Sequence, residues 1–158
     1  MQNLIVVDTR EKGHKKILEY FNKVDQDFIV SKLDAGDYML FKDYTTIIDK
    51  KDGLGELCNN LTGKTKRADG TYERNRERLA REVERAKELG CERFIFLIQS
   101  SRIKSMDDIF NWKSPHTRVT GKQLWGIMKE FKSQHDCNYM IVSQKEIGQR
   151  IIDLLTKK

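Results

Sequence analysis

Proline, long apolar runs and paired cysteines are scarce in this sequence, and each shortage excludes a class of protein. Pro115 is the only proline, and no Gly/Ser-rich linker divides the chain, so we expect one domain over residues 1–158. The first apolar run, Leu4 to Val7, ends at Asp8 and is too short for a signal peptide or a membrane span. We therefore expect no membrane partner.

The cysteines and histidines also lack the spacing of metal sites. Cys58, Cys91 and Cys137 are far apart and form no CxxC pair, which argues against a disulfide framework and a zinc ribbon. The GKT at 63–65 lacks the glycine that a phosphate-binding loop needs five residues earlier. A reducing, cytoplasmic compartment fits this cysteine usage best.

Charge is what the sequence has in abundance. Charged residues make up 34% of the chain, and the formal net charge is +6, so the surface is polar and basic. A basic balance favours acidic partners, with nucleic acid first and an anionic membrane second. A basic protein without any role on nucleic acid is the alternative that charge alone leaves open.

Hydrophobic periodicity predicts an alternation of strands and helices. Strands are expected at 3–8, 27–33, 93–99 and 138–143, and a hairpin of two strands at 36–51 with its turn near 42–44. Helices are expected at 14–24, 54–61, 73–90, 121–134 and 145–155, with a loop at 62–72. This order predicts an α/β fold in which helices cover a mixed sheet.

The expected hairpin brings carboxylates together. A turn centred on Asp43 places Asp37 opposite Asp49, and two like charges in that position destabilise a hairpin unless a cation lies between them. Asp49 and Lys51 are two residues apart and share a strand face. Two carboxylates, a divalent metal and an ammonium group suit phosphodiester hydrolysis. Asp8 and Glu11, at the end of the first strand, are placed to join them.

Three segments in this order, VVDTRE (6–11), LDAGDYML (33–40) and IIDKK (47–51), resemble the nuclease domain of the XPF family of structure-specific endonucleases. That family is a branch of the PD-(D/E)XK superfamily. The resemblance implies a restriction-endonuclease-like mixed sheet in a three-layer α/β/α arrangement. It also implies an endonuclease that needs Mg²⁺ or Mn²⁺ and acts on DNA in repair, recombination or replication.

The resemblance also implies residue roles. Asp37 and Asp49 would be metal ligands, Lys51 the catalytic lysine, and Asp8 and Glu11 further members of the catalytic site that support the metal, with Asp8 as a third metal residue. Lys50 stands where the family has arginine, and we expect it to contact DNA.

Two departures from the family pattern keep an alternative open. Asp49 stands where the family has glutamate, and Gly55 stands where it has its last aspartate, with Glu56 one residue later. A catalytically inactive DNA-binding or partner-scaffolding domain is therefore the rival function. The helix–hairpin–helix module that often follows in the family is not expected within 1–158. Small phage and bacterial relatives look like free-standing domains of this kind. This likeness suggests that the protein is located in the cytoplasm of a prokaryotic or phage-infected cell.

A basic stretch predicts how DNA is held. Lys64, Lys66 and Arg67 lie in the expected loop, where no helical ion pairing explains them, so we expect them to contact phosphates together with Arg74 and Arg78. A solvated helix face with i,i+4 ion pairs is the alternative. By the resemblance, the substrate would be branched DNA or a single-strand/double-strand junction. The resemblance also implies pairing through C-terminal helices, and with the apolar stripes at 122–132 and 147–155 it predicts a homodimer.

Overall fold

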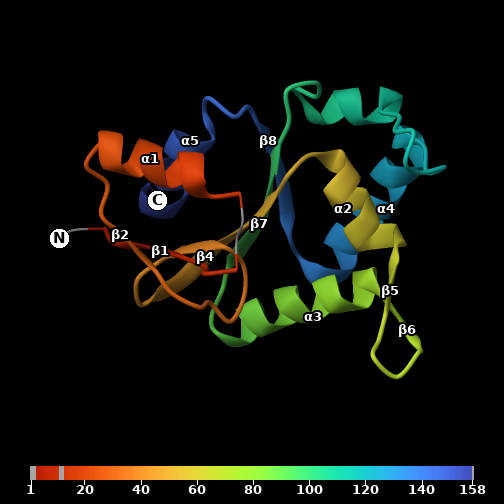
Figure 1. Ribbon diagram of the computed structural model, residues 1–158, viewed down its shortest axis with the longest axis horizontal. Helices are drawn as coiled ribbons and strands as arrows, with labels where there is room; N and C mark the ends of the chain where they lie inside the picture. Colours follow the sequence, from red (N-terminus) through yellow and green to blue (C-terminus); the bar gives the residue numbers. More distant parts are fainter. Residues whose placement is uncertain (1–2, 11–12, 158) are drawn as a thin grey trace.

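The computed structural model describes residues 3–10 and 13–157, which form a mixed sheet of six strands in the order β2-β1-β3-β4-β7-β8 (Figure 1). The strands are β1 Ile5–Val7, β2 Phe28–Val30, β3 Tyr38–Leu40, β4 Asp43–Lys51, β7 Arg93–Gln99 and β8 Asn138–Val142. The first strand is parallel to β2 and antiparallel to β3, β3 is antiparallel to β4, and β4, β7 and β8 run parallel. The mixed sheet expected from the sequence is confirmed.

Helices cover both faces of this sheet, as Figure 1 shows. One face packs against α1 Lys15–Lys23 and α5 Ile147–Thr156. The other packs against α2 Leu54–Thr62, α3 Asn75–Glu88 and α4 Gly121–His135, with the short 3₁₀ helix η1 Met106–Asn111 against α4. Each face has its own apolar cluster, so the three-layer α/β/α arrangement is confirmed.

The alternation of side chains along β4 decides which residues share a face. Ile47 belongs to the apolar cluster under α2, α3 and α4, whereas Ile48 belongs to the cluster under α1 and α5. Because successive strand residues point to opposite faces, Asp49 and Lys51 lie with Ile47, and Lys50 lies with Ile48. The central position of β4, between β3 and β7, buries all three polar side chains.

The hairpin of β3 and β4 has the expected pairing at one end and a different turn at the other. Tyr38 lies opposite Ile48, the register that the sequence predicts. The turn is tighter than predicted, because Leu40 pairs with Asp43 and Lys42 takes a left-handed backbone with φ of 61°. An irregularity between Tyr38 and Leu40 absorbs the extra residues of β4.

The prediction of a loop at 62–72 is wrong in part, because strands near both ends of this segment form a second small sheet. Strands β5 Lys64–Lys66 and β6 Tyr72–Arg74 pair in an antiparallel hairpin whose turn contains Gly70 with φ of 90°. Charged three-residue strands have no alternation of apolar and polar side chains, so hydrophobic periodicity does not detect them. The turn is readable in retrospect, because Asp69 accepts a hydrogen bond from the N–H of Thr71 beside that glycine.

The apolar stripes of α4 and α5 lie inside this chain's own core. Met128 and Phe131 of α4 and Ile151 of α5 are fully buried. These stripes are therefore not free to form a dimer interface. The homodimer stays a prediction. Over the described ranges, no helix is long and apolar enough to span a bilayer.

Candidate active site

A buried ion pair lies at the carboxyl end of β4. The Nζ of Lys51 is 3.2 Å from Oδ2 of Asp49, and the two side chains are 8% and 7% exposed. Phe96 of the neighbouring strand pairs with Asp49, and its ring lies 5.8 Å from the Lys51 ammonium. Asp49 and Lys51 therefore lie on one face of β4, as predicted, and their position in the sheet shields both side chains from solvent.

Asp37 is held beside this pair by the backbone of β4. Its own N–H donates to the carbonyl of Ile48 at 2.8 Å, and its Oδ2 accepts the N–H of Lys50 at 2.8 Å. The proximity of Asp37 contributes to raising the pKa of Asp49, after the larger effect of burial. The predicted juxtaposition of Asp37 and Asp49 is thus present in the geometry.

Glu82 of α3 is a third carboxyl group at this site, and the sequence reasoning missed it. Its Oε2 accepts the N–H of Gly36 at 3.1 Å, and its carboxyl group is hydrogen-bonded to Asp49. Glu82 sits directly before Val83 in the buried stripe of α3. That position on the edge of an apolar stripe is the signal that would have separated it from the other charges of the helix.

Burial and mutual repulsion shift the ionisation of these groups. Burial raises the pKa of Asp49 to about 7, although the Lys51 ammonium opposes the shift. Burial, together with the Asp49 charge, raises the pKa of Glu82 to about 8. Burial lowers the pKa of Lys51, but its neighbouring carboxylates outweigh that effect and the net shift is upward. Ionising both Asp49 and Glu82 would place two negative charges side by side in a buried site. The two carboxyl groups therefore share a proton near neutral pH.

The donor set at this site matches a magnesium-type ion. In the described part of the chain, no ready-made group of three or more His, Cys, Asp or Glu side chains is arranged to hold a metal. Mg²⁺ is commonly held by one or two carboxylates together with waters and substrate phosphates. Asp37 and Asp49 supply two such carboxylates, and burial, with a smaller contribution from the Asp37 charge, raises the pKa of Asp49, a shift that a bound cation would oppose.

The other predicted acids have different surroundings. Asp8 is buried, its Oδ1 accepts the N–H of Leu33 at 2.8 Å, and its Oδ2 accepts Nε of Arg10 at 3.0 Å. Glu11 lies outside the described residues. Glu56 of α2 places Oε1 4.0 Å from the Lys51 ammonium while its Oε2 accepts the N–H of Asp52 at 2.9 Å.

A cleft of about 450 Å³ opens beside the carboxyl groups of Asp8, Asp37 and Glu82. Its walls carry Asp8, Asp37, Lys51 and Glu82 together with a set of polar and basic side chains that includes Arg10, Asn59, Asn60, Thr65, Asn75, Arg78, Arg81 and Arg85. Of the predicted DNA-binding residues, Arg78 lines the cleft directly. Cationic walls around an acidic floor suit a polyanion that must approach carboxylates.

The remaining predicted cations lie elsewhere. Lys64, Lys66, Arg67 and Arg74 belong to the β5–β6 hairpin beside the cleft. Lys50 points to the opposite face of the sheet, where its Nζ is 2.6 Å from Oδ1 of Asp52 and its side chain is 2% exposed. The sequence reasoning missed Arg81 and Arg85, which follow Arg78 along one side of α3 at helical spacing.

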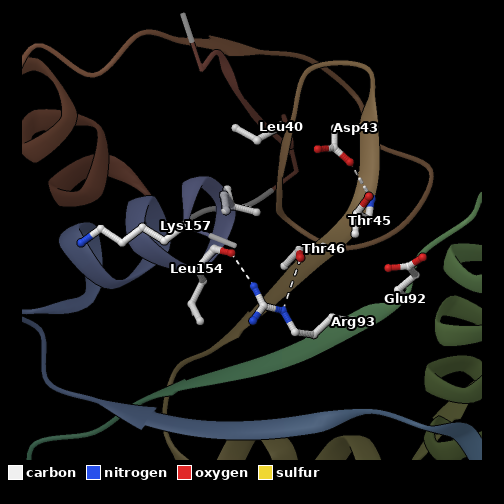
Figure 2. Close-up of a pocket in the computed structure, with 9 residues that line it drawn as sticks. Leu40, Asp43, Thr45, Thr46, Glu92, Arg93, Leu154 and Lys157 are labelled. Atoms are coloured by element: carbon white, nitrogen blue, oxygen red, sulfur yellow. Dashed lines mark hydrogen bonds between the residues drawn. The ribbon is translucent and has the colours of Figure 1, made fainter. Parts of the chain in front are cut away.

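A second hollow, of about 410 Å³, lies at the opposite end of β4, where Asp43 begins the strand (Figure 2). Its central contact is structural. The guanidinium of Arg93 donates to the carbonyl of Leu154 at 2.6 Å and to Oγ1 of Thr46 at 3.3 Å, as Figure 2 shows. These hydrogen bonds fasten the end of α5 to the sheet, and we assign this hollow no part in chemistry.

Comparisons with known proteins agree with this fold. Residues 7–156 match the ERCC4 domain family. Two solved structures are similar in fold: XPF from Aeropyrum pernix in complex with DNA, with a TM-score of 0.66 and 15% identity, and XPF from the same organism, with 0.64 and 17%. They cover 97% and 96% of this chain, which spans 63% and 62% of theirs. None of the curated proteins compared is a match. The resemblance to the XPF family is confirmed.

Proposed function

This chain belongs to the ERCC4 domain family, and from that premise we propose that it is a metal-dependent DNA endonuclease that cuts phosphodiester bonds in branched or junction DNA. The observation that carries the proposal is the buried pair of Asp49 and Lys51, 3.2 Å apart and next to Asp37, of which Lys51 lines an arginine-rich cleft together with Asp37. A strongly desolvated acid and ammonium group in a polar cleft are typical of a catalytic site. We also propose that residues 1–158 form one domain.

The residues have separable roles in this proposal. Mg²⁺ or Mn²⁺ held by Asp37 and Asp49 would polarise the scissile phosphate and lower the pKa of an attacking water. Lys51 keeps its proton because carboxylates surround it, so its ammonium group can stabilise charge that develops on the phosphate. Glu82 holds a proton in its hydrogen bond with Asp49. The N–H of Gly36 fixes the orientation of Glu82, and Glu82 in turn orients the Asp49 carboxylate.

Asp8 is given a positioning role in place of direct ligation. Both of its carboxylate oxygens already accept hydrogen bonds, one from Leu33 and one from Arg10. The Arg10 guanidinium also donates to the carbonyl of Leu33 at 2.7 Å. Asp8 thereby fastens the segment that precedes Gly36 and Asp37, and it holds the guanidinium of Arg10 at the edge of the cleft.

DNA binding rests mainly on phosphate contacts in this proposal. The arginines of α3 line the cleft, and the β5–β6 hairpin adds cations beside it. Such contacts position a duplex without reading its sequence. Lys50, paired with Asp52 on the opposite face, is given a structural role in the end of β4.

A catalytically inactive DNA-binding domain is the second candidate. Aspartate at position 49 is one methylene shorter than the glutamate of the family pattern, and position 55 is glycine. Glu56, whose Oε1 lies 4.0 Å from the Lys51 ammonium, is our candidate to take over from the missing aspartate if the site is active.

A cleavage panel separates the two candidates. The protein is incubated with labelled duplex, single-stranded, splayed-arm, flap and four-way DNA in Mg²⁺, in Mn²⁺ and in chelator. We expect strand scission on the branched substrates with either metal and none in chelator. Salt-dependent binding of the same DNA without scission under any of these metal conditions would favour the inactive domain. Absence of DNA binding would refute both.

A further inference from the structure

One face of the β5–β6 hairpin combines cations with an exposed aromatic ring. Opposed residues of an antiparallel pair project to the same face, and so do residues two apart. Lys66 lies opposite Tyr72, and Lys64 lies opposite Arg74. These four side chains therefore share one face, which we call the outer face, while Thr65 and Glu73 share the other.

The inner face is fastened to the protein body. Oγ1 of Thr65 donates to Oδ1 of Asn75 at 2.6 Å, at the start of α3. Glu73 forms an ion pair with Arg81 of α3, and a weaker one with Arg67 at 3.9 Å. The hairpin is thus held in place by its inner side chains, and its outer side chains are not needed for that attachment.

Tyr72 has the largest exposed fraction, 62%, among the large hydrophobic side chains of the described residues that are exposed. Its neighbours on the outer face are cations, so the patch is not an apolar surface of the kind that proteins use to pair. A single aromatic ring among lysines and arginines is the composition of a surface that binds single-stranded nucleic acid. The cations attract phosphates, and the ring offers a platform for a base.

We propose that the outer face binds the single-stranded arm of a DNA junction, with one unpaired base stacked on Tyr72 and phosphates held by Lys64, Lys66 and Arg74. The proposal rests on the proposed nuclease function and names the feature of the substrate that the site selects. In a duplex, the faces of the bases are covered by their neighbours, so the ring gains little from paired DNA. Tyr72 would therefore favour unpaired DNA, whereas the cations bind every DNA shape.

The hairpin lies where a strand leaves the cleft. Thr65 and Arg78 line the cleft wall, and Nη1 of Arg78 lies 3.5 Å from Oγ1 of Thr65. From that wall the two strands project beyond the body of the molecule, next to the start of α3 (Figure 1). A duplex seated over the carboxylates would accordingly place its single-stranded arm along this projection.

The test crosses a change in the protein with a change in the DNA. Binding of wild type, Tyr72→Ala and Tyr72→Phe is measured by fluorescence anisotropy in chelator, on duplex, single-stranded and splayed-arm DNA and on the same unpaired strands with abasic sites. We expect Tyr72→Ala to weaken binding of unpaired DNA by about 5- to 140-fold, the loss of one stacked base, and to leave duplex binding unchanged. Phenylalanine should restore wild-type affinity.

The abasic strands make the stacking claim specific. Wild type and Tyr72→Ala should bind them equally, because no base is left to stack. As a control, Lys66→Ala should weaken duplex and unpaired DNA alike. Equal losses on duplex and unpaired DNA for Tyr72→Ala, no loss at all, or a loss that persists on abasic strands would overturn the proposal. Because the assay contains no metal, DNA binding without a Tyr72 effect refutes only the stacking, whereas absence of DNA binding refutes the proposed function itself.

Discussion

Replacing Asp49 by asparagine is expected to stabilise the metal-free protein, and increasingly so as the pH rises. Burial raises the pKa of Asp49 from its usual 3.8 to about 7. A carboxyl group shifted in this direction favours the folded state in its neutral form. That contribution is complete below the unfolded pKa and is lost as the pH rises through about 7. Asparagine carries no charge at any of these pH values and so avoids the loss.

The size of the effect follows from the two pKa values. The cost of ionising Asp49 in the folded state is roughly 2 kcal/mol at pH 5 and roughly 4 kcal/mol at pH 8, so the advantage of the variant grows by about 2–3 kcal/mol between them. For a domain of this size, that corresponds to about 4–12 °C in Tm. Loss of the Asp49 charge also removes one cause of the raised pKa of Glu82, which acts in the same direction.

The assay is urea unfolding at pH 5, 6, 7 and 8 in chelator, for wild type, Asp49→Asn and Asp107→Asn. Asp107 is an exposed acid on η1, so its variant should track the wild type at every pH. The attraction between Lys51 and ionised Asp49 is already contained in the pKa of about 7, so loss of the ion pair adds no further pH dependence to the difference between the two curves. The slope against pH is therefore the diagnostic quantity. A difference between Asp49→Asn and wild type that does not change with pH would refute the reasoning.

Three further predictions concern binding, packing and assembly. Replacing Lys64, Lys66 and Arg67 by alanine should flatten the salt dependence of DNA binding by roughly two to three units, nearer two because Arg67 is already paired with Glu73; an unchanged slope would mean that these cations do not touch phosphates. Gly36→Ala should lower the free energy of unfolding by about 2–4 kcal/mol, because φ is +71° and a Cβ would lie 2.4 Å from an Ile47 methyl group. The control Gly55→Ala, in α2, meets no atom within 4 Å and should leave stability unchanged or raise it by up to about 1 kcal/mol. The homodimer expected from the family resemblance is checked by light scattering at tens of micromolar protein, where a monomeric mass would contradict it.

The site residues that could be predicted from local sequence patterns are those that lie on one strand or in one hairpin. The period of two along IIDKK fixes Asp49 and Lys51 on a common face, and the pairing of Tyr38 with Ile48 brings Asp37 beside them. Both follow from strand geometry alone. The buried run RFIFLIQ likewise identifies a central strand, since it is apolar on both faces.

The residues that sequence reasoning missed depend on packing between distant segments. Glu82 joins the site because α3 lies across the end of the sheet and the Gly36 N–H points at its carboxyl group. In the sequence it is marked only by its place beside the buried Val83, at the edge of the apolar stripe of a highly charged helix. Asp8 is predicted from the sequence as a site residue, but the hydrogen bonds that its oxygens accept from Arg10 and Leu33 are not. Lys50, next to Lys51 in sequence, points to the opposite face and pairs with Asp52.

Cleavage by variants of the buried pair tests the central claim most directly. Turnover on a splayed-arm or flap substrate in Mg²⁺ or Mn²⁺ is compared for wild type, Asp49→Asn, Lys51→Ala and Asp37→Asn, with Lys66→Ala as a cation control outside the cleft floor. DNA affinity in chelator is measured in parallel. We predict that the first three variants lose cleavage while they still bind DNA, and that Lys66→Ala keeps its turnover at saturating DNA. Cutting at the wild-type rate by Asp49→Asn or Lys51→Ala would contradict the assignment of this site.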